Sequence, residues 1–168
     1  RAQRETGAPV GTHAIHAPRD QFDLLVAAGA DPRRCFFSHT EAKFGWQGRT
    51  LEQHADYLTA IAREGGSMLF NNFGLVRDTP WPDLVFIIRQ LCERGHADRV
   101  LISVDFVWEW IDGQTVVQHA AKYPEAQPRT CAYMMTDAVP ALLKAGFSAR
   151  DIRTFLVDNP RRIFGGTP

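Results

Sequence analysis

Three residues that can bind metal ions stand at the ends of short apolar segments of this sequence. They are His13, His39 and Asp105. Neutral imidazole suits zinc, and carboxylate suits zinc or manganese. A single histidine in such a place is more often a hydrogen-bonded polar residue than a ligand. Three candidates in equivalent places favour a metal site, because chance would scatter them over helices and loops.

The apolar segments themselves are predicted strands. They are nearly continuous in apolarity, as is typical of parallel strands that are buried on both faces, and they cover residues 9–12, 35–37, 68–70 and 100–103. A helical pattern follows each of them, with expected helices at 21–28, 50–64, 83–94 and 138–144. Capping residues Thr50 and Ser148 begin two helices, and the last helix is expected to end before Asn159-Pro160.

Two linkers of similar sequence indicate a repeated unit. Residues 29–34 and 95–99 each begin with a glycine, contain an Asp and an Arg, and lead into an apolar strand. The glycine supplies a left-handed helix stop. The repeat predicts an α/β fold with right-handed crossovers, in which the carboxyl ends of the strands open onto the active site.

The number of units sets a limit on the architecture. The chain of 168 residues contains four βα units, whereas a (β/α)8 barrel needs eight and typically about 250 residues. Four strands alone would leave two apolar edges open. We expect an upstream half outside this chain, or pairing with another chain such as a homodimer. A complete small doubly wound sheet is the alternative.

Composition excludes some classes of partner. Lys plus Arg and Asp plus Glu are both 19, so the formal net charge is zero, which argues against a nucleic-acid partner. No apolar run approaches the roughly 20 residues of a membrane span, so no membrane partner is expected. Cys35, Cys92 and Cys131 are far apart and odd in number. We expect buried free thiols in a reducing compartment, and hence a cytoplasmic protein.

Further residues are candidates for contact with a small-molecule substrate. His16 lies three residues beyond His13, and Asn72 follows the third predicted strand. Trp108 and Trp110 lie in the long segment 106–130, directly after Asp105. They could line an apolar pocket, or they could pack on outer helices or on a partner subunit.

The other histidines are interpreted differently. His54 lies on a helix, His96 in a linker and His119 in a loop-like stretch, and all three are expected at the surface. Phe44 and Trp46, after His39, are open to either the pocket or the packing interpretation.

The ordered set of segments resembles the phosphotriesterase family, phosphotriesterase-related proteins within the amidohydrolase superfamily. Residues 6–13 resemble its fifth strand, 34–39 its sixth, 71–74 the end of its seventh and 99–105 its eighth. Residues 159–164 are similar to its closing segment. The resemblance implies a (β/α)8 TIM-type barrel, of which residues 1–168, as the C-terminal half of a single domain, supply strands and helices five to eight.

The resemblance also implies a binuclear metal centre with two divalent ions. Zinc is the first expectation, with manganese, cobalt or iron as alternatives. His13 and His39 would bind one ion. Asp105 would bind the other and accept the proton of a hydroxide that the two ions share. The remaining ligands, a His-x-His pair and a carboxylated lysine, belong to the family's first four strands, so the chain alone is expected to be inactive.

The implied activity is metal-assisted hydrolysis of esters, lactones or phosphotriesters. An amidase on the same barrel is a further hypothesis. The alternative is a non-catalytic barrel that binds a small apolar ligand or a protein partner.

Two positions depart from the family pattern. Asn71-Asn72 stands where relatives often have an Asp followed by Arg or His, and Val104 stands where Asn or His is common. Asn72 can form hydrogen bonds but cannot shuttle a proton at neutral pH. The expected ligands are unaffected, so we expect an altered substrate range or a weak activity.

Overall fold

Four parallel strands form the centre of the structure. The computed structural model describes residues 1–74, 79–105, 109–111, 114–116 and 130–165, with the backbone alone at 109–111 and 114–116. The sheet has the order β1-β2-β3-β4, which confirms the four predicted strands. Their bounds are β1 (Val10–His13), β2 (Cys35–Ser38), β3 (Ser67–Phe70) and β4 (Val100–Ile102).

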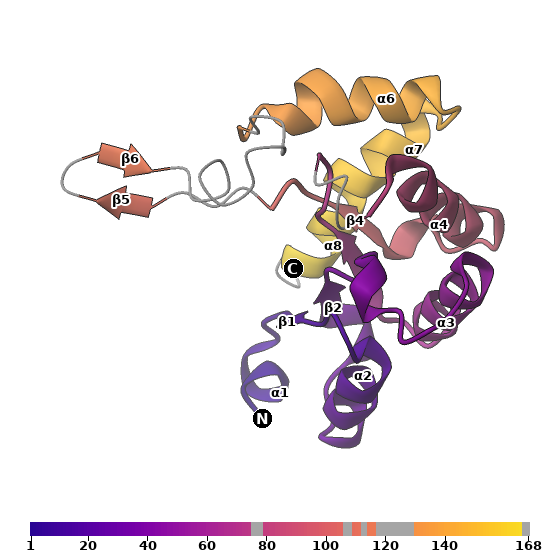
Figure 1. Ribbon diagram of the computed structural model, residues 1–168. Coiled ribbons are helices and arrows are strands. Elements are labelled where there is room, and N and C mark those ends of the chain that lie inside the picture. Colours follow the sequence, from indigo (N-terminus) through magenta and orange to yellow (C-terminus); the bar gives the residue numbers. More distant parts are fainter. Residues whose placement is uncertain (75–78, 106–108, 112–113, 117–129, 166–168) are drawn as a thin grey trace.

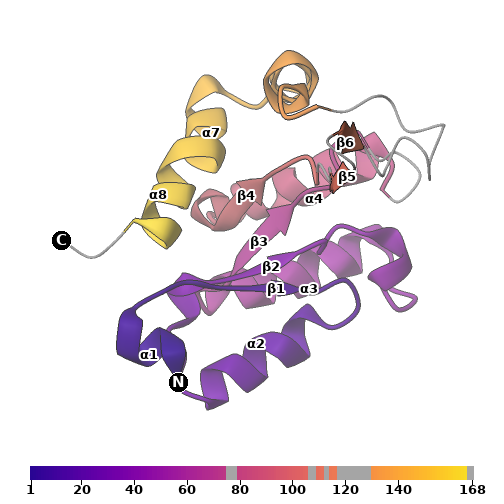
Figure 2. The same cartoon turned by 90° about the vertical axis from the view of Figure 1, so that its left-hand side faces the viewer.

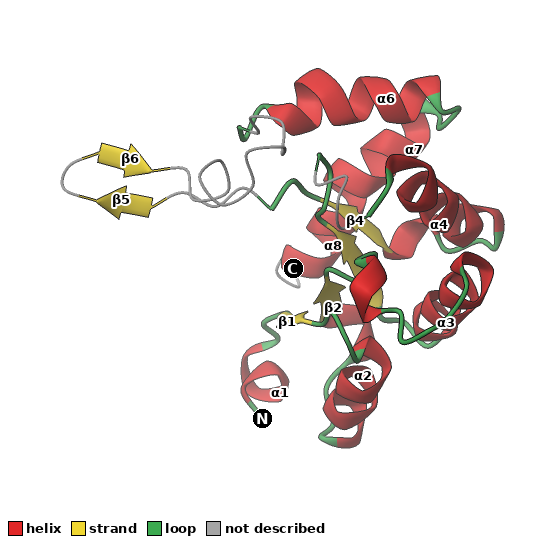
Figure 3. Ribbon diagram, in the orientation of Figure 1, coloured by secondary structure: helices red, strands yellow, loops and turns green. Residues whose placement is uncertain are grey.

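Helices alternate with these strands along the chain, as Figure 3 shows by colour. They are α1 (Ala2–Thr6), α2 (Pro18–Ala27), α3 (Leu51–Arg63), α4 (Trp81–Glu93), α6 (Val139–Lys144), α7 (Ala149–Arg153) and α8 (Asn159–Phe164). Within the segment expected as a loop, β5 (Glu109–Ile111) and β6 (Gln114–Val116) pair as an antiparallel hairpin.

The helices cover one face of the sheet. Figures 1 and 2 show α2, α3 and α4 side by side along that face. The fully buried side chains between the layers include Phe22, Phe37, Leu58, Met68 and Ile87. Burying such side chains contributes roughly 1.5–3 kcal/mol each, so this layer supplies much of the stability.

The other face of the sheet is less covered by the described residues. In β2, Cys35 and Phe37 are buried, whereas Phe36 and Ser38 are only half-buried. The prediction that the strands are buried on both faces is therefore wrong for β2 within this chain. The half-buried face is the one that would point into a barrel, and a barrel needs further strands to close over it.

The structure also bears on the predictions about the cysteines and about membrane-spanning segments. All three thiols are free, but Cys35 is buried, Cys92 is half-buried and Cys131 is exposed, so the expectation of burial is wrong for Cys131. Among the described residues, no helix is long and apolar enough to cross a membrane.

Both predicted helix caps are present. The Thr50 hydroxyl accepts a hydrogen bond from the Gln53 backbone N–H at 3.2 Å, and the Gln53 side chain accepts from the Thr50 N–H at 2.9 Å. Ser148 and Asp151 form the same reciprocal arrangement. These pairs satisfy backbone donors that a helix leaves free in its first turn, which is why the helices begin there.

The end of the last helix was predicted wrongly. The helix does not end before Asn159-Pro160: a π-helical turn at Thr154–Asp158 joins α7 to α8, which runs on to Phe164. Pro160 lies in the first turn of α8, directly after the π-helical turn, and the change of hydrogen-bond register there accommodates its missing N–H. The Asn159 side chain reaches the start of β4 and donates to the carbonyls of Ala97 at 2.8 Å and Val100 at 2.7 Å.

This contact predicts a stability loss. Asn159→Ala leaves two backbone carbonyls without their side-chain donor, so the free energy of unfolding should fall by about 1–3 kcal/mol in urea titrations. Thr154→Ala is the matched control, because its hydroxyl donates only to Arg150 of the same helix, and it should change stability by less than about 0.5 kcal/mol. Equal effects of the two variants would show that Asn159 does not secure the last helix to the sheet.

Candidate metal centre

The pairing of β1 with β2 brings two histidines together. His13 is opposite Ser38, the last residue of β2, in the parallel register, and His39 directly follows Ser38. The centroids of the two imidazole rings are 4.5 Å apart and their planes are inclined by 60°. Two imidazoles at this separation can donate to one ion when their lone pairs converge.

The two histidines line a hollow at the carboxyl ends of the strands. Its volume is about 550 Å³, and Asp105 lies on the same hollow at the end of β4. His39 and Asp105 both have left-handed backbone conformations, with φ of 57° and 45°. Such values are uncommon outside glycine and recur at functional sites. The structure thus places His13, His39 and Asp105 on one surface.

These three residues do not make a complete metal site by themselves. The described part of the chain contains no group of three or more His, Cys, Asp or Glu side chains placed to hold a metal ion. The donor types, two imidazoles and a carboxylate, fit a divalent ion of the zinc kind, and the hollow is open beside them. A complete coordination sphere would require donors from outside these residues.

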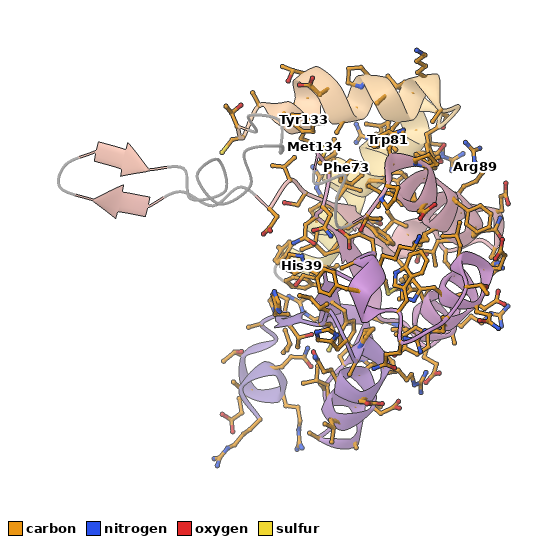
Figure 4. The ribbon with its side chains drawn as sticks, in the orientation of Figure 1. His39, Phe73, Trp81, Arg89, Tyr133 and Met134 are labelled. Atoms are coloured by element: carbon orange, nitrogen blue, oxygen red, sulfur yellow. The ribbon has the colours of Figure 1, made fainter. Side chains whose placement is uncertain are left out.

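Two consecutive asparagines hold the His39 ring, which lies close to the sheet in Figure 4. The Asn71 Oδ1 accepts from the His39 backbone N–H at 3.0 Å, and the Asn71 Nδ2 is 3.2 Å from His39 Nε2. The Asn72 Oδ1 is 3.3 Å from His39 Nδ1. Both asparagines are buried, so the ring is fixed by groups that cannot exchange freely with water.

A buried glutamate supports these asparagines. Glu41 is fully buried, and its Oε1 accepts from the backbone N–H groups of Asn71 and Asn72, each at 2.6 Å. Burial raises the pKa of Glu41 to about 7, the two N–H donors oppose the rise, and the negative charge of Asp105 adds to it. Among the described residues, no group forms a hydrogen bond with its second oxygen.

Sequence reasoning missed Glu41. The only available signal was a carboxylate two residues beyond His39, in a segment expected as a loop.

The candidate substrate residues differ in how far the structure describes them. Asn72 is buried beside His39, while His16 is exposed and meets the Phe44 ring edge-on, with centroids 5.9 Å apart. Phe44 is 57% exposed, so it remains available to a ligand. Trp108 lies outside the described residues, and Trp110 lies in β5, where only the backbone is described.

His54 is not a surface residue, contrary to the prediction. It is 1% exposed, its Nε2 donates to the Thr40 carbonyl at 2.6 Å, and it stacks between Trp46 and Tyr57. Trp46 is therefore a packing residue. Its indole donates to the Glu41 carbonyl at 3.0 Å, which ties this cluster to the candidate metal centre. His96 is half-buried, and His119 lies outside the described residues.

A parallel sheet covered by helices on one face, with histidine and aspartate side chains at its carboxyl ends, defines one half of a (β/α)8 barrel. The model of the phosphotriesterase family matches residues 1–164. The chain belongs to the phosphotriesterase family, whose characterised relatives are hydrolases. The structure supplies strands and helices five to eight of the barrel, as the sequence predicted.

Individual relatives show how much of the barrel is present. A phosphotriesterase homology protein of Mycobacterium tuberculosis is 31% identical over 97% of this chain and 47% of its own length. An aryldialkylphosphatase of Saccharolobus solfataricus is 26% identical over 97% of this chain and 49% of its own. The structure of an organophosphorus hydrolase from Deinococcus radiodurans, 28% identical, aligns with a TM-score of 0.76 over 98% of this chain and 48% of its own. The chain thus spans about half the length of the relatives it matches.

The buried His54 predicts a pH dependence of stability. Burial lowers its pKa to about 4, with the positive charge of Arg49 acting in the same direction, whereas the unfolded ring titrates near 6.5. Between these values the unfolded chain binds more protons than the folded chain. The free energy of unfolding should therefore fall as the pH is lowered from about 6.5 to about 4, by up to roughly 3 kcal/mol at 1.36 kcal/mol per unit.

His54→Gln is the variant that tests this, because an amide can keep the bond to the Thr40 carbonyl without titrating. The difference between the urea stabilities of wild type and variant should change over pH 4–6.5 and be constant above it. This difference isolates His54 from Glu41, whose raised pKa acts with the opposite sign. A difference that does not vary with pH would contradict the buried neutral imidazole.

Proposed function

We propose that the natural protein that carries this chain is a metal-dependent hydrolase of ester, lactone or phosphotriester substrates. The observation that carries the proposal is the pair of imidazoles 4.5 Å apart on the same hollow as Asp105, at the strand ends of a phosphotriesterase-family half-barrel. The family is in general metal-dependent. We propose zinc as the first candidate, with manganese, cobalt or iron as alternatives, and two ions per site.

An upstream half completes the barrel in this proposal. β1 and β4 are the edges of the described sheet, and the matched relatives are about twice as long as this chain. Residues 1–168 would then be the C-terminal half of one domain, inactive without the donors that the other half brings. A homodimer that covers the open edges stays a prediction, because nothing in the fold distinguishes it from an upstream half.

The roles of the residues follow from their places. Divalent cations at such a site polarise the substrate's carbonyl or phosphoryl oxygen and lower the pKa of water. His13 and His39 would hold one cation, and Asp105 would hold the other and would accept a proton from the attacking water. His16 and Phe44 are exposed in the segments that follow β1 and β2, and we propose that they contact an apolar substrate group. Trp108 and Trp110 stay predicted pocket residues.

The departures at Asn71 and Asn72 shape the expected activity. The Asn72 amide is buried between His39 Nδ1 and the Thr79 hydroxyl, so neither end is turned to substrate in this arrangement. It cannot relay a proton. Proton removal would then depend on Asp105 and water alone, and a slow hydrolase is the expected result.

The alternative function is a non-catalytic barrel that binds a small apolar ligand or a protein partner. The exposed Phe44 would serve either function. Ligand binding that persists in a chelator, with no hydrolysis of any ester, lactone, phosphotriester or amide offered, would favour it.

The hydrolase proposal is tested by two substitutions and one matched control in the natural protein. His39→Asn and Asp105→Asn should each lower bound metal and reduce kcat/KM by about 100-fold or more, since metal assistance supplies several kcal/mol. His96→Asn, in the linker before β4, is the control and should retain both. Metal content is measured by elemental analysis, and turnover on ester, lactone and phosphotriester panels.

Retained metal and retained turnover in both His39→Asn and Asp105→Asn would reject the proposal. Turnover that resists chelation in the wild type would reject its metal dependence.

A further inference from the structure

The two ring nitrogens of His39 face the carboxamides of consecutive asparagines, and this arrangement fixes more than the position of the ring. A neutral imidazole carries its proton on one nitrogen and its lone pair on the other, and only the nitrogen with the lone pair can bind a metal ion. A carboxamide offers a donor at one end and an acceptor at the other. The direction of each amide therefore determines which His39 nitrogen holds the proton.

The direction of the Asn72 amide follows from a chain of hydrogen bonds. The Thr79 hydroxyl donates its single proton to the Glu41 carbonyl at 3.1 Å. The same Thr79 oxygen therefore accepts from the Asn72 Nδ2 at 3.4 Å. That contact turns the Asn72 Oδ1 toward His39 Nδ1, 3.3 Å away. An amide oxygen can only accept, so the His39 Nδ1 carries the proton.

The direction of the Asn71 amide gives the same answer independently. Its Oδ1 accepts from the His39 backbone N–H at 3.0 Å, a group that can only donate. Its Nδ2 therefore faces His39 Nε2, 3.2 Å away. Because the amide nitrogen is a donor, Nε2 must present a lone pair. Both asparagines thus specify the same tautomer.

We propose that Asn71, Asn72 and Thr79 are positioning residues that hold His39 in the tautomer protonated at Nδ1, so that Nε2 is the nitrogen presented to a divalent cation. Nε2 has one lone pair, so a cation there requires the Asn71 amide to turn aside, while the Asn72 contact can remain. The cation rests on the proposed function, whereas the tautomer is a property of the metal-free chain. Fixing a ligand's tautomer through its second nitrogen typically changes metal affinity by about 10–100-fold.

Burial strengthens the inference. Asn71, Asn72 and Thr79 are 5%, 4% and 2% exposed, so water competes weakly for their polar groups. Glu41 holds the backbone of both asparagines through its Oε1 and accepts the Thr79 hydroxyl through its carbonyl. The amides therefore cannot rotate without breaking buried hydrogen bonds, each of which costs about 1–3 kcal/mol to leave unmade.

The tautomer can be measured directly by nitrogen NMR of the histidine rings in the natural protein, ¹⁵N-labelled and freed of metal. The spectra are recorded about two pH units above the ordinary imidazole pKa of about 6.5, and His39 is assigned by the signals lost in His39→Gln. We expect the proton on Nδ1 in the wild type. Asn72→Leu removes the acceptor and should move the population toward protonated Nε2. Asn72→Asp keeps an acceptor and should restore the wild-type tautomer.

A second pair of variants tests the link through Thr79. Thr79→Val frees the Asn72 amide to turn and should mix the two tautomers. Thr59→Val is the matched control, because Thr59 is equally buried but donates to Ala55 within α3, and it should leave the His39 signals unchanged.

Cobalt titration of the natural protein that carries this chain, followed by visible absorption, provides the metal readout. Asn72→Leu should weaken cobalt binding by about 10–100-fold, and Asn72→Asp by less than about threefold. A proton on Nε2 in the metal-free wild type, or a tautomer and cobalt affinity unchanged in Asn72→Leu, would overturn the inference. Protonated Nδ1 in the wild-type natural protein, with no binding of cobalt to that protein, would refute the proposed metal site and leave the tautomer assignment standing.

Discussion

The parallel register of the central sheet is the constraint on which the site depends. Because β1 and β2 run in the same direction with His13 opposite Ser38, His39 emerges beside His13 and not at the far end of the sheet. β3 and β4 continue the same alignment, with Phe70 opposite Ile102, so that Asn71 and Asp105 end on the same hollow. A shift of one residue in any of these pairs would move the side chains to the other face.

The chemistry is then concentrated in short segments that the strands position. His39 and Asp105 each turn through a left-handed backbone conformation, which costs of order 1–3 kcal/mol at a residue other than glycine. A buried carboxylate, Glu41, holds the segment after β3 against the segment after β2. Both features oppose stability on their own, and both keep the imidazole of His39 in one place. Locally unfavourable features of this kind are expected at functional sites, where the position of a side chain matters more than local stability.

The sequence predicted the strands, most helices and both capping boxes, because each depends on local pattern and local hydrogen bonds. It also predicted that His13, His39 and Asp105 would share one edge of the sheet, since strand ends alone determine this. It failed at the last helix, where a π turn that no periodicity reveals carries the chain past Pro160. The prediction of an exposed His54 is wrong, because the residue lies on the same helical face as the buried Leu58 and Ile61, and position on the helix outweighs the polarity of the ring.

The hydrogen bonds that hold the His39 ring could not be predicted from sequence. Asn71, Thr79 and Glu41 are separated by up to 38 residues and meet only when three loops pack together. Their partners depend on which carbonyl and which N–H each one faces, and that information exists only in three dimensions. The resemblance to the phosphotriesterase family marked Asn71-Asn72 as a departure, and the structure shows where the two amides are used instead.

The proposal that His39 binds a metal ion together with His13 or Asp105 is tested most directly by an anomalous-scattering map at the zinc edge. The map is measured on crystals of the natural protein loaded with zinc. We expect a peak within the coordination distance of about 2.0–2.2 Å of a nitrogen of His39, with His13 or Asp105 as a further ligand. A zinc-loaded protein whose only peaks lie away from His13, His39 and Asp105 would contradict it.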